Sequence, residues 1–420
     1  MKDSNSPDVE VIVVGGGPAG AATASHLAAR GRDVLLLERG HFPRQKPCGE
    51  YYSPGVVDAL QRLGALERVL ASEHERPGGM WIRARGSSFE LTYPSGPAGL
   101  SAGQTGGRRG LGIRRYHFDA ALVENAREGG VRVEQGVAVS GVHCDENGRV
   151  SGVRVGRGGN GSEVASGVVT ARFVVGADGR HSVVARSLDL GLPVRWPRRL
   201  GLHAHFEPAA DADLGPLASG LGEMHVGDGA YCGLAPVGGG LLVAGLVTPL
   251  GDKERGESTG DYFALKLDDV PGAAQRLAGA HRVGKVMGIG PLARRVARTA
   301  GPGYLLVGDA AGYFDPFTGE GVFRALRGAE LASSAIEASL QSGDDIPEGY
   351  EQARRNAFAG KERLTTLVQL ALAWPPALGY ALKRLETRRG KTEEIKAARG
   401  DYTPATNALR PAYLAALLAP

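Results

Sequence analysis

The chain has 420 residues, with 49 Lys and Arg against 45 Asp and Glu, and a formal net charge of +4 at pH 7. This near balance, without a basic run interleaved with aromatic residues, argues against a nucleic-acid-binding protein. The three cysteines lack metal-ligand spacing, and no signal peptide or membrane-length apolar stretch is evident. We therefore expect a reduced, cytoplasmic protein that does not span a membrane.

The first elements along the chain predict a dinucleotide-binding unit. Val9–Val14 is a continuous apolar run, and it is followed by three glycines and an alanine-rich helix over Ala19–Arg30. A second apolar run, Asp33–Leu37, ends at Glu38. A strand, a glycine turn, a helix, a strand and then an acid are typical of a Rossmann-type βαβ unit with buried parallel strands.

The middle of the chain alternates between short strands and one helix. We expect a strand pair in Met80–Tyr93, a helix over Phe118–Glu128, a strand over Val131–Gln135, a hairpin in Val137–Val155 and a buried strand over Phe173–Gly176. An antiparallel sheet is then predicted from Leu200–Phe206, Gly222–Val226, Tyr231–Pro236 and Leu241–Val247. Tyr304–Val307 is a further buried strand, and the pattern is helical from about Glu320 onward.

These elements predict an α/β fold with interrupted domains. We expect a Rossmann-type domain of the glutathione reductase-like class, binding FAD or NAD, over residues 1–79, 106–186 and 291–340. An inserted antiparallel sheet for the substrate is expected over 80–105 and 187–290, and a helical C-terminal region over 341–420. The dinucleotide-type blocks are therefore separated by the inserted sheet.

The glycine turn has the spacing Gly15-x-Gly17-x-x-Gly20. Gly15 permits the tight turn, Gly17 lets the backbone approach a pyrophosphate, and Gly20 lets the helix pack close to the sheet. The pyrophosphate then meets free N–H groups at the helix N-terminus, and Glu38 is placed to accept from ribose hydroxyls. FAD and NAD both fit this motif.

Two later blocks favour FAD. Val174–Gly179 and Leu305–Gly312 resemble the second and third fingerprints of the FAD-dependent aromatic hydroxylase and geranylgeranyl reductase superfamily. The resemblance implies that Asp309 binds the ribityl chain and that Asp178 helps to place the pyrophosphate region.

Further residues resemble the geranylgeranyl reductase branch. Tyr313–Gly321 is similar to its GDAAG…P…GEG segment, and Gly312 and Val322 stand where typical hydroxylases carry His and Asn. Phe42–Glu50 also resembles that branch, which has a cysteine–glycine pair beside the flavin, and Arg115 matches an arginine that usually contacts the cofactor. The cofactor-binding residues predicted in this way are Gly15, Gly17, Pro18, Ala19, Gly20, Glu38, Arg39, Arg44, Cys48, Gly49, Arg115, Asp178, Gly179, Gly308, Asp309, Pro316, Gly319, Gly321 and Val322.

Three residues are candidates for catalysis: Cys48, Glu320 and Tyr231. Cys48 protonates or steers the substrate, or is a small buried hydrophobe. Glu320 is a proton donor or, as we prefer, a cap of the helix that follows. Tyr231 lies on a predicted strand that passes over the flavin in this superfamily. His203 and His205 share one strand face, and without an acidic or cysteine partner at ligand spacing we expect no metal site.

The resemblance implies an FAD-dependent enzyme that reduces a C=C bond in a hydrophobic small molecule. A monooxygenase acting on an aromatic or polyketide-like substrate is the alternative. A flavin halogenase and a flavin-binding protein without turnover are weaker ones, since the Trp-x-Trp-x-Ile-Pro halogenase motif is absent. No second glycine fingerprint is present, so the electron donor is NAD(P)H visiting transiently or a small electron-carrier protein. The apolar segment 364–389 packs in the core, as we prefer, or makes a peripheral membrane contact.

Overall fold

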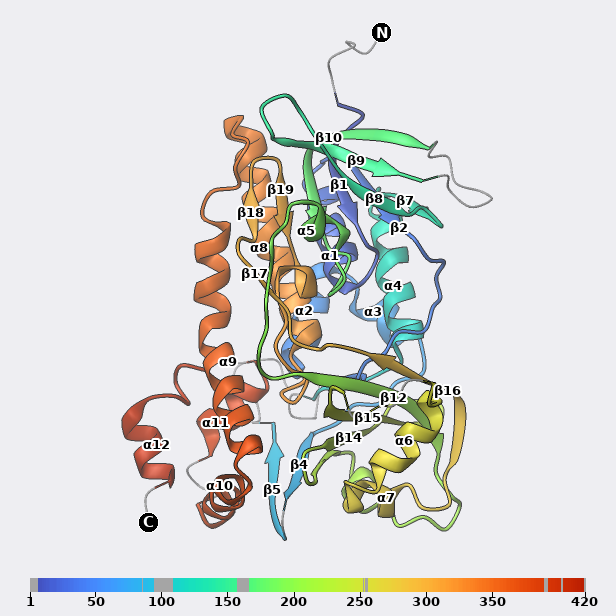
Figure 1. Cartoon of the computed structure of the whole chain (residues 1–420), viewed down its shortest axis with the longest axis vertical. Coiled ribbons are helices and arrows are strands. Elements are labelled where there is room, and N and C mark those ends of the chain that lie inside the picture. The colour runs from blue at the N-terminus through green and yellow to red at the C-terminus, as the bar shows by residue number, and fades with distance from the viewer. Residues whose placement is uncertain are drawn as a thin grey trace.

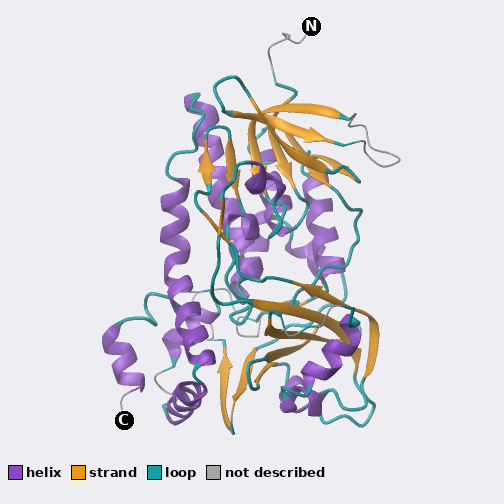
Figure 2. Ribbon diagram, in the orientation of Figure 1, coloured by secondary structure: helices purple, strands orange, loops and turns teal. Residues whose placement is uncertain are grey.

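The computed structural model describes residues 7–84, 86–93, 109–156, 166–251, 253, 256–388, 392–401 and 403–418. Within the ranges predicted above, residues 1–6, 85, 94–108, 157–165, 252, 254, 255, 389–391, 402, 419 and 420 lie outside this description. Two sheets are stacked along the long axis of the molecule, with helices beside the upper sheet and a cluster of helices near the C-terminus (Figures 1 and 2).

The first sheet has the strand order β18-β19-β10-β1-β2-β7. Strands β19, β10, β1, β2 and β7 run parallel, as the continuous apolar runs predicted. Helix α1 packs against both α4 and α8. The bounds of these elements are β1 Val9–Val14, α1 Pro18–Ala28, β2 Val34–Glu38, α4 Arg115–Glu128, β7 Arg132–Gln135, β10 Gly167–Gly176, β18 Ala300–Gly301, β19 Tyr304–Leu306 and α8 Gly321–Ser342.

Strand β10 is longer than the predicted Phe173–Gly176 because it serves two pairings. Its first residues pair antiparallel with β9 (Val150–Val155), which forms the expected hairpin with β8 (Val139–Cys144). Its last residues pair parallel with β1. The first part, which includes the exposed Val168, is exposed or half-buried, unlike the buried end of the strand from Phe173 to Gly176.

The second sheet has the order β16-β12-β15-β14-β13-β4-β5. Its described neighbours pair antiparallel, as predicted, except that β13 pairs parallel with β4, which comes from a separate earlier segment of the chain. Edge strand β16 was not predicted because its largely exposed sequence carries His281, Arg282 and Lys285. The bounds are β4 Gly79–Ala84, β5 Ser87–Thr92, β12 Arg199–Glu207, β13 Gly222–Val226, β14 Tyr231–Pro236, β15 Leu242–Pro249 and β16 His281–Ile289.

The two faces of the second sheet have different neighbours. Leu202 and Phe206 of β12 pack in a core with α6 (Thr259–Leu267) and residues of α7 (Pro271–Arg276). The alternate residues Gly201, His203 and His205 lie on the opposite face, toward the first sheet. The short elements are β3 Tyr51–Tyr52, α2 Pro54–Leu63, α3 Leu66–Leu70, β6 Leu111–Gly112, α5 Val183–Ser187, β11 Gly191–Leu192, η1 Gly215–Leu217, β17 Arg295–Val296 and η2 Gly308–Ala311.

The C-terminal region is helical, as predicted, with α9 (Tyr350–Ala373), α10 (Pro375–Thr387), α11 (Glu393–Arg399) and α12 (Pro411–Leu418). Trp374 separates α9 from α10, which begins at Pro375, so the apolar segment beginning at 364 is two helices. Leu378 and Leu382 are buried against the second sheet, whereas Leu367, Leu370 and Trp374 are exposed. No helix among the described residues is long and apolar enough to cross a bilayer.

Candidate functional site

The three glycine-bearing turns meet at one edge of the first sheet. Val14, at the end of β1, is in register with Gly176 of β10, and Gly176 is in register with Leu306 of β19. Because these strands are parallel, the turns that follow their carboxyl ends lie side by side. This edge is where open α/β sheets bind ligands.

The three glycines of the first turn differ in what a side chain at each position would contact. A methyl group at Gly20 would lie 1.8 Å from the carbonyl oxygen of Gly15, and one at Gly15 would lie 2.7 Å from that of Ala177. A methyl group at Gly17 would meet nothing closer than the Nζ atom of Lys46 at 4.0 Å. Gly15 and Gly20 are therefore required by packing, whereas Gly17 leaves open space at the N-terminus of α1.

A single cavity extends from these turns to the second sheet. Its lining includes Gly17 and Asp309 from the first domain and Met224 and Leu292 from the sheet side. The predicted cofactor residues that line it are Gly17, Pro18, Ala19, Cys48, Gly49, Arg115, Gly179, Gly308, Asp309, Pro316, Gly319, Gly321 and Val322. Tyr231 lines it as well.

Other predicted cofactor residues do not line the cavity and support its walls. Glu38 accepts hydrogen bonds from the backbone N–H groups of Gly16 and Gly40, at 2.8 and 2.9 Å, and pairs with Arg44 at 3.3 Å. Arg39 is exposed. Asp178 accepts from the N–H of Val183 at 2.6 Å, at the start of α5.

The cavity fits the anionic part of a dinucleotide. Lys46 Nζ lies between two of the turns, since methyl groups at Gly17 and Gly179 would lie 4.0 and 3.9 Å from it. Burial, with a smaller contribution from Arg115, lowers the pKa of Lys46. A bound pyrophosphate would favour the charged ammonium and accept from it. Its position between the two turns favours a role for Lys46 in facing the phosphates.

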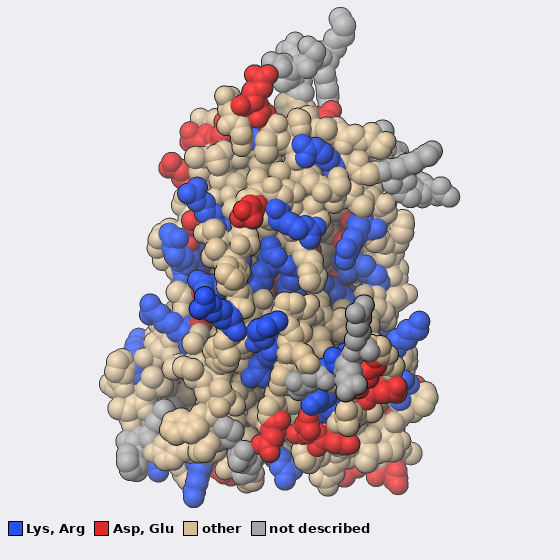
Figure 3. Space-filling view, in the orientation of Figure 1, with Lys and Arg blue, Asp and Glu red and all other residues tan. Residues whose placement is uncertain are grey.

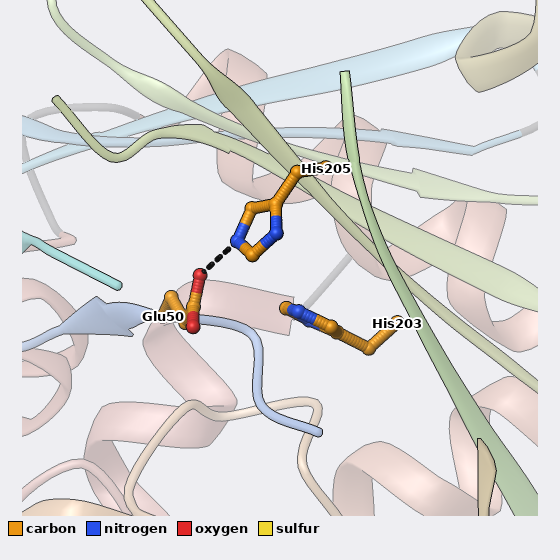
Figure 4. Close-up of side chains that lie close together, drawn as sticks. All are labelled: Glu50, His203 and His205. Atoms are coloured by element: carbon orange, nitrogen blue, oxygen red, sulfur yellow. Dashed lines mark hydrogen bonds and ion pairs between the residues drawn. The ribbon is translucent and has the colours of Figure 1, made fainter. Parts of the chain in front are cut away.

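Three consecutive residues fasten the Cys48–Glu50 loop to the second sheet. The carbonyl oxygen of Cys48 lies 2.6 Å from Nδ1 of His203, and Glu50 Oε2 lies 2.6 Å from Nε2 of His205 (Figure 4). Between them, Gly49 packs on Gly245, where a methyl group would lie 3.6 Å from Gly49 Cα. The loop that carries Cys48 is therefore held by the face of the sheet that lines the cavity.

Glu50 holds this loop in place through both oxygens of its carboxylate. It is fully buried, and its backbone has a φ of +49°, which costs energy for a residue other than glycine. Its second carboxylate oxygen accepts from the backbone N–H of Arg115 at 2.7 Å. No acidic residue stands at ligand spacing from the histidines in the sequence, but the fold gives His205 an acidic partner in Glu50, which is 155 residues away.

Glu50, His203 and His205 are also close enough to be considered as metal ligands. Hydrogen bonds account better for the geometry, because His203 Nδ1 faces a carbonyl oxygen and His205 Nε2 faces the carboxylate at 2.6 Å. Two nitrogen–oxygen contacts of this length are ordinary hydrogen bonds. We therefore treat the three residues as a hydrogen-bonded group.

Tyr231 of β14 is bonded to the loop before α8. Its hydroxyl donates to Asp315 Oδ1 at 2.6 Å, and the same oxygen accepts from the N–H of Phe317 at 2.9 Å. Burial, together with the Asp315 carboxylate, raises the pKa of Tyr231 well above its usual range. The phenol therefore keeps its proton and holds the Pro316–Phe317 turn against the sheet.

Tyr231→Phe should lower the free energy of unfolding by about 1.5–3 kcal/mol, because it removes a hydrogen bond to a buried carboxylate. Tyr262→Phe is the matched control, since Tyr262 is also buried but, among the described residues, its hydroxyl bonds only to the Thr248 hydroxyl at 3.2 Å, so about 1 kcal/mol is expected. Denaturant unfolding measures both. Equal losses in the two variants would contradict the role of Asp315.

The preferred role of Glu320 as a helix cap was wrong. Glu320 occupies the N-cap position of α8, but its side chain makes no capping hydrogen bond. Its buried carboxylate instead pairs with Lys361 of α9 at 3.4 Å, and it does not line the main cavity. The helical tail supplies this partner, and nothing in the local sequence indicated it.

Residues 8–212 match the family model of the FAD binding domain. Menaquinone reductase of Mycobacterium tuberculosis is 29% identical over 371 residues, which cover 83% of each chain. The chain contains an FAD binding domain and is an FAD-dependent oxidoreductase. The resemblance drawn from the three turns is thereby confirmed.

Two other proteins are similar to this chain, one in sequence and one in fold. Digeranylgeranylglycerophospholipid reductase of Methanosarcina acetivorans is 28% identical to the oxidoreductase over 349 residues, covering 82% of this chain and 78% of its own. The structure of the flavin-dependent brominase Bmp2 superposes with a TM-score of 0.78 at 21% identity, covering 96% and 98% of the two chains. At that identity the likeness to the brominase shows the fold alone.

Proposed function

We propose that this oxidoreductase reduces a carbon–carbon double bond in a hydrophobic small molecule. The observation that carries the proposal is that Cys48 lines the same cavity as Gly17, Asp309 and a largely apolar sheet face. Pockets of this kind, apolar with a few polar groups, are typical of binding sites for hydrophobic ligands. The apolar lining residues of the sheet side are Met80, Met224, Val247, Ile289 and Leu292.

The named relatives support reduction. Two similar proteins are reductases named for lipids, one for menaquinone and one for a digeranylgeranyl phospholipid. The segment from Tyr313 to Gly321, which resembles the geranylgeranyl reductases, contributes Tyr313, Pro316, Phe317, Gly319 and Gly321 to the cavity. Neither observation favours oxygen insertion.

Residues of the chain would perform distinct tasks. Gly17 and Lys46 would hold the pyrophosphate, and Asp309 would bind the ribityl chain. Bound FAD, once reduced, supplies a hydride. The Cys48 thiol would give the proton to the neighbouring substrate carbon, and the apolar walls would exclude water. The hydride and the proton together account for the two hydrogens that a double bond gains.

The electron donor that we propose is NAD(P)H in a transient encounter, or a small electron-carrier protein. Lys and Arg side chains gather across the middle of one face of the molecule (Figure 3). Such a face would attract the phosphates of NAD(P)H or an acidic carrier. A peripheral membrane contact through 364–389, which the exposed Leu370 and Trp374 would make, stays a prediction.

Anaerobic turnover tests the proposed reaction. The FAD-loaded protein, reduced with dithionite and mixed with geranylgeraniol in detergent, should yield a product that has gained two hydrogens, as measured by mass spectrometry. A product that forms only after oxygen is admitted, and that has gained an oxygen atom, would support the monooxygenase. A product that needs halide and gains a halogen would support the halogenase.

Two cysteine variants test the role of Cys48 in that assay. Cys48→Ala should slow the anaerobic reaction by about a hundredfold, because a positioned proton donor typically contributes that much. Cys232→Ala is the control, since Cys232 is buried in the core on the other face of the sheet, with Leu202 and Phe206. An unchanged rate in Cys48→Ala would remove Cys48 from the mechanism.

A further inference from the structure

The ring of His203 has a defined tautomer. Its Nδ1 atom lies 2.6 Å from the carbonyl oxygen of Cys48. Because a carbonyl oxygen can only accept, Nδ1 carries the ring proton, and the neutral ring then has a lone pair on Nε2. His203 therefore presents a hydrogen-bond acceptor at its other end.

This acceptor is buried and has no partner among the described residues. His203 is 2% exposed, its ring lines the main cavity, and Nε2 makes no hydrogen bond. Native structures rarely leave such a group unpaired, and an exception calls for an explanation. A ligand in the cavity that carries a donor would satisfy it.

The surroundings of His203 keep the ring neutral. Burial lowers the pKa of His203, and the His205 ring and the Arg115 guanidinium lower it as well. The Glu50 carboxylate raises the pKa, but its effect is smaller than that of burial. The ring of His205 stands edge-on to that of His203, with centroids 4.6 Å apart. Glu50 already accepts from His205 and from the Arg115 N–H, so it is engaged elsewhere.

We propose that His203 Nε2 accepts a hydrogen bond from a hydroxyl group of the substrate, and that the cavity therefore selects apolar molecules with a hydroxyl end over those that can only accept. The proposal relies on the proposed function only in taking this cavity as the substrate site. The hydroxyl would lie beside the Cys48–Gly49 loop, and the apolar body would contact side chains such as Met224 and Leu292. Alcohols, phenols and hydroquinones meet this requirement, whereas their ethers, ketones and quinones do not.

A pair of inert probes tests the selection without turnover. The oxidised, FAD-loaded protein is titrated with 2-naphthol and with 2-methoxynaphthalene, and binding is followed by the perturbation of the flavin spectrum. We expect 2-naphthol to bind at least about tenfold more tightly, because only it can donate to the buried nitrogen. Equal affinities, or no binding of 2-naphthol, would overturn the proposal. Since no reaction is required, failure of the reductase assay leaves this result unaffected.

The variant His203→Asn distinguishes the role of Nε2 from that of Nδ1. Its side-chain N–H can still donate to the Cys48 carbonyl, but it offers no acceptor at the position of Nε2. In this variant the two probes should bind with about equal affinity, and the affinity for FAD should be unchanged. His225→Asn is the matched control: His225 is buried on β13, bonds to Glu223 at 2.7 Å and does not line the cavity, so it should keep the full preference.

Two outcomes with His203→Asn would count against the proposal. If the variant binds FAD more weakly and keeps the preference for 2-naphthol, then Nε2 accepts from the flavin and the substrate role is wrong. If both preference and FAD affinity are unchanged, then another group selects the hydroxyl. Thermal unfolding of each variant confirms that the comparison is made on folded protein.

The selection should also depend on pH in a defined direction. The cation of His203 has no acceptor at Nε2, so the preference for 2-naphthol should be constant at neutral pH and be lost as pH falls below the usual range of histidine. The lowered pKa places this loss on the acid side of 6.5. The His203→Asn variant should show no such dependence, whereas an identical pH profile in both proteins would contradict the assignment to His203.

Discussion

Gly20→Ala should prevent the protein from folding with FAD, whereas Gly17→Ala should fold and bind FAD weakly. A methyl group at Gly20 would lie 1.8 Å from the Gly15 carbonyl oxygen, so α1 must move away from the turn, at a cost of about 3 kcal/mol or more. Among the described residues, a methyl group at Gly17 meets nothing closer than Lys46 Nζ at 4.0 Å, so only the modest loss of an N-cap glycine, about 1 kcal/mol, is expected.

The FAD affinity of Gly17→Ala should nevertheless fall by about tenfold to a hundredfold, because the methyl group occupies the space through which a pyrophosphate approaches the helix N-terminus. Thermal unfolding measures the stability of both variants, and titration of the apoprotein with FAD measures the affinity. Gly191→Ala provides a control at a glycine with an ordinary φ, no neighbour within 4 Å among the described residues and no contact with the cavity. Normal FAD affinity in Gly17→Ala would place the pyrophosphate elsewhere.

The parts of the site that the sequence predicted are those set by local geometry. Gly15, Gly17 and Gly20 each follow from the shape of one strand–turn–helix unit, and parallel strands bring the turns after Gly176 and Leu306 to the same edge. Buried parallel strands are continuous apolar runs, which are easy to recognise. The domain with the strongest local patterns was therefore the one predicted in most detail.

The parts that the sequence did not predict depend on contacts between distant segments. Glu50 and His205 are 155 residues apart, and only the packing of the loop on the second sheet makes them partners. Glu320 was interpreted from its place before a helix, but its partner Lys361 comes from the helical tail. A search for conspicuous ligand spacings has no means of finding such pairs, because spacing in sequence carries no information about them.

Arg115→Ala should destabilise the fold by about 3–5 kcal/mol, because it leaves a buried carboxylate without its partner. Arg115 donates from Nε and Nη2 to the two oxygens of Asp119, at 2.6 and 2.7 Å, and Asp119 is fully buried. Arg44 lies 3.9 Å from Asp119, which is too far for a hydrogen bond, and Lys46 interacts with Asp119 only electrostatically. Denaturant unfolding at constant FAD concentration measures the loss.

The same arginine is predicted to contact the cofactor, and a double variant separates the two roles. Arg115→Met with Asp119→Leu replaces the buried ion pair by apolar groups, which is often nearly neutral for stability. If Arg115 also contacts FAD, the double variant should unfold like the wild type in the absence of cofactor and still bind FAD at least about tenfold more weakly. If the double variant instead has the stability and the FAD affinity of the wild type, the Arg115 guanidinium serves only to balance the charge of Asp119. Lys46 and the turn at Gly17 would then hold the anionic part of the cofactor without Arg115.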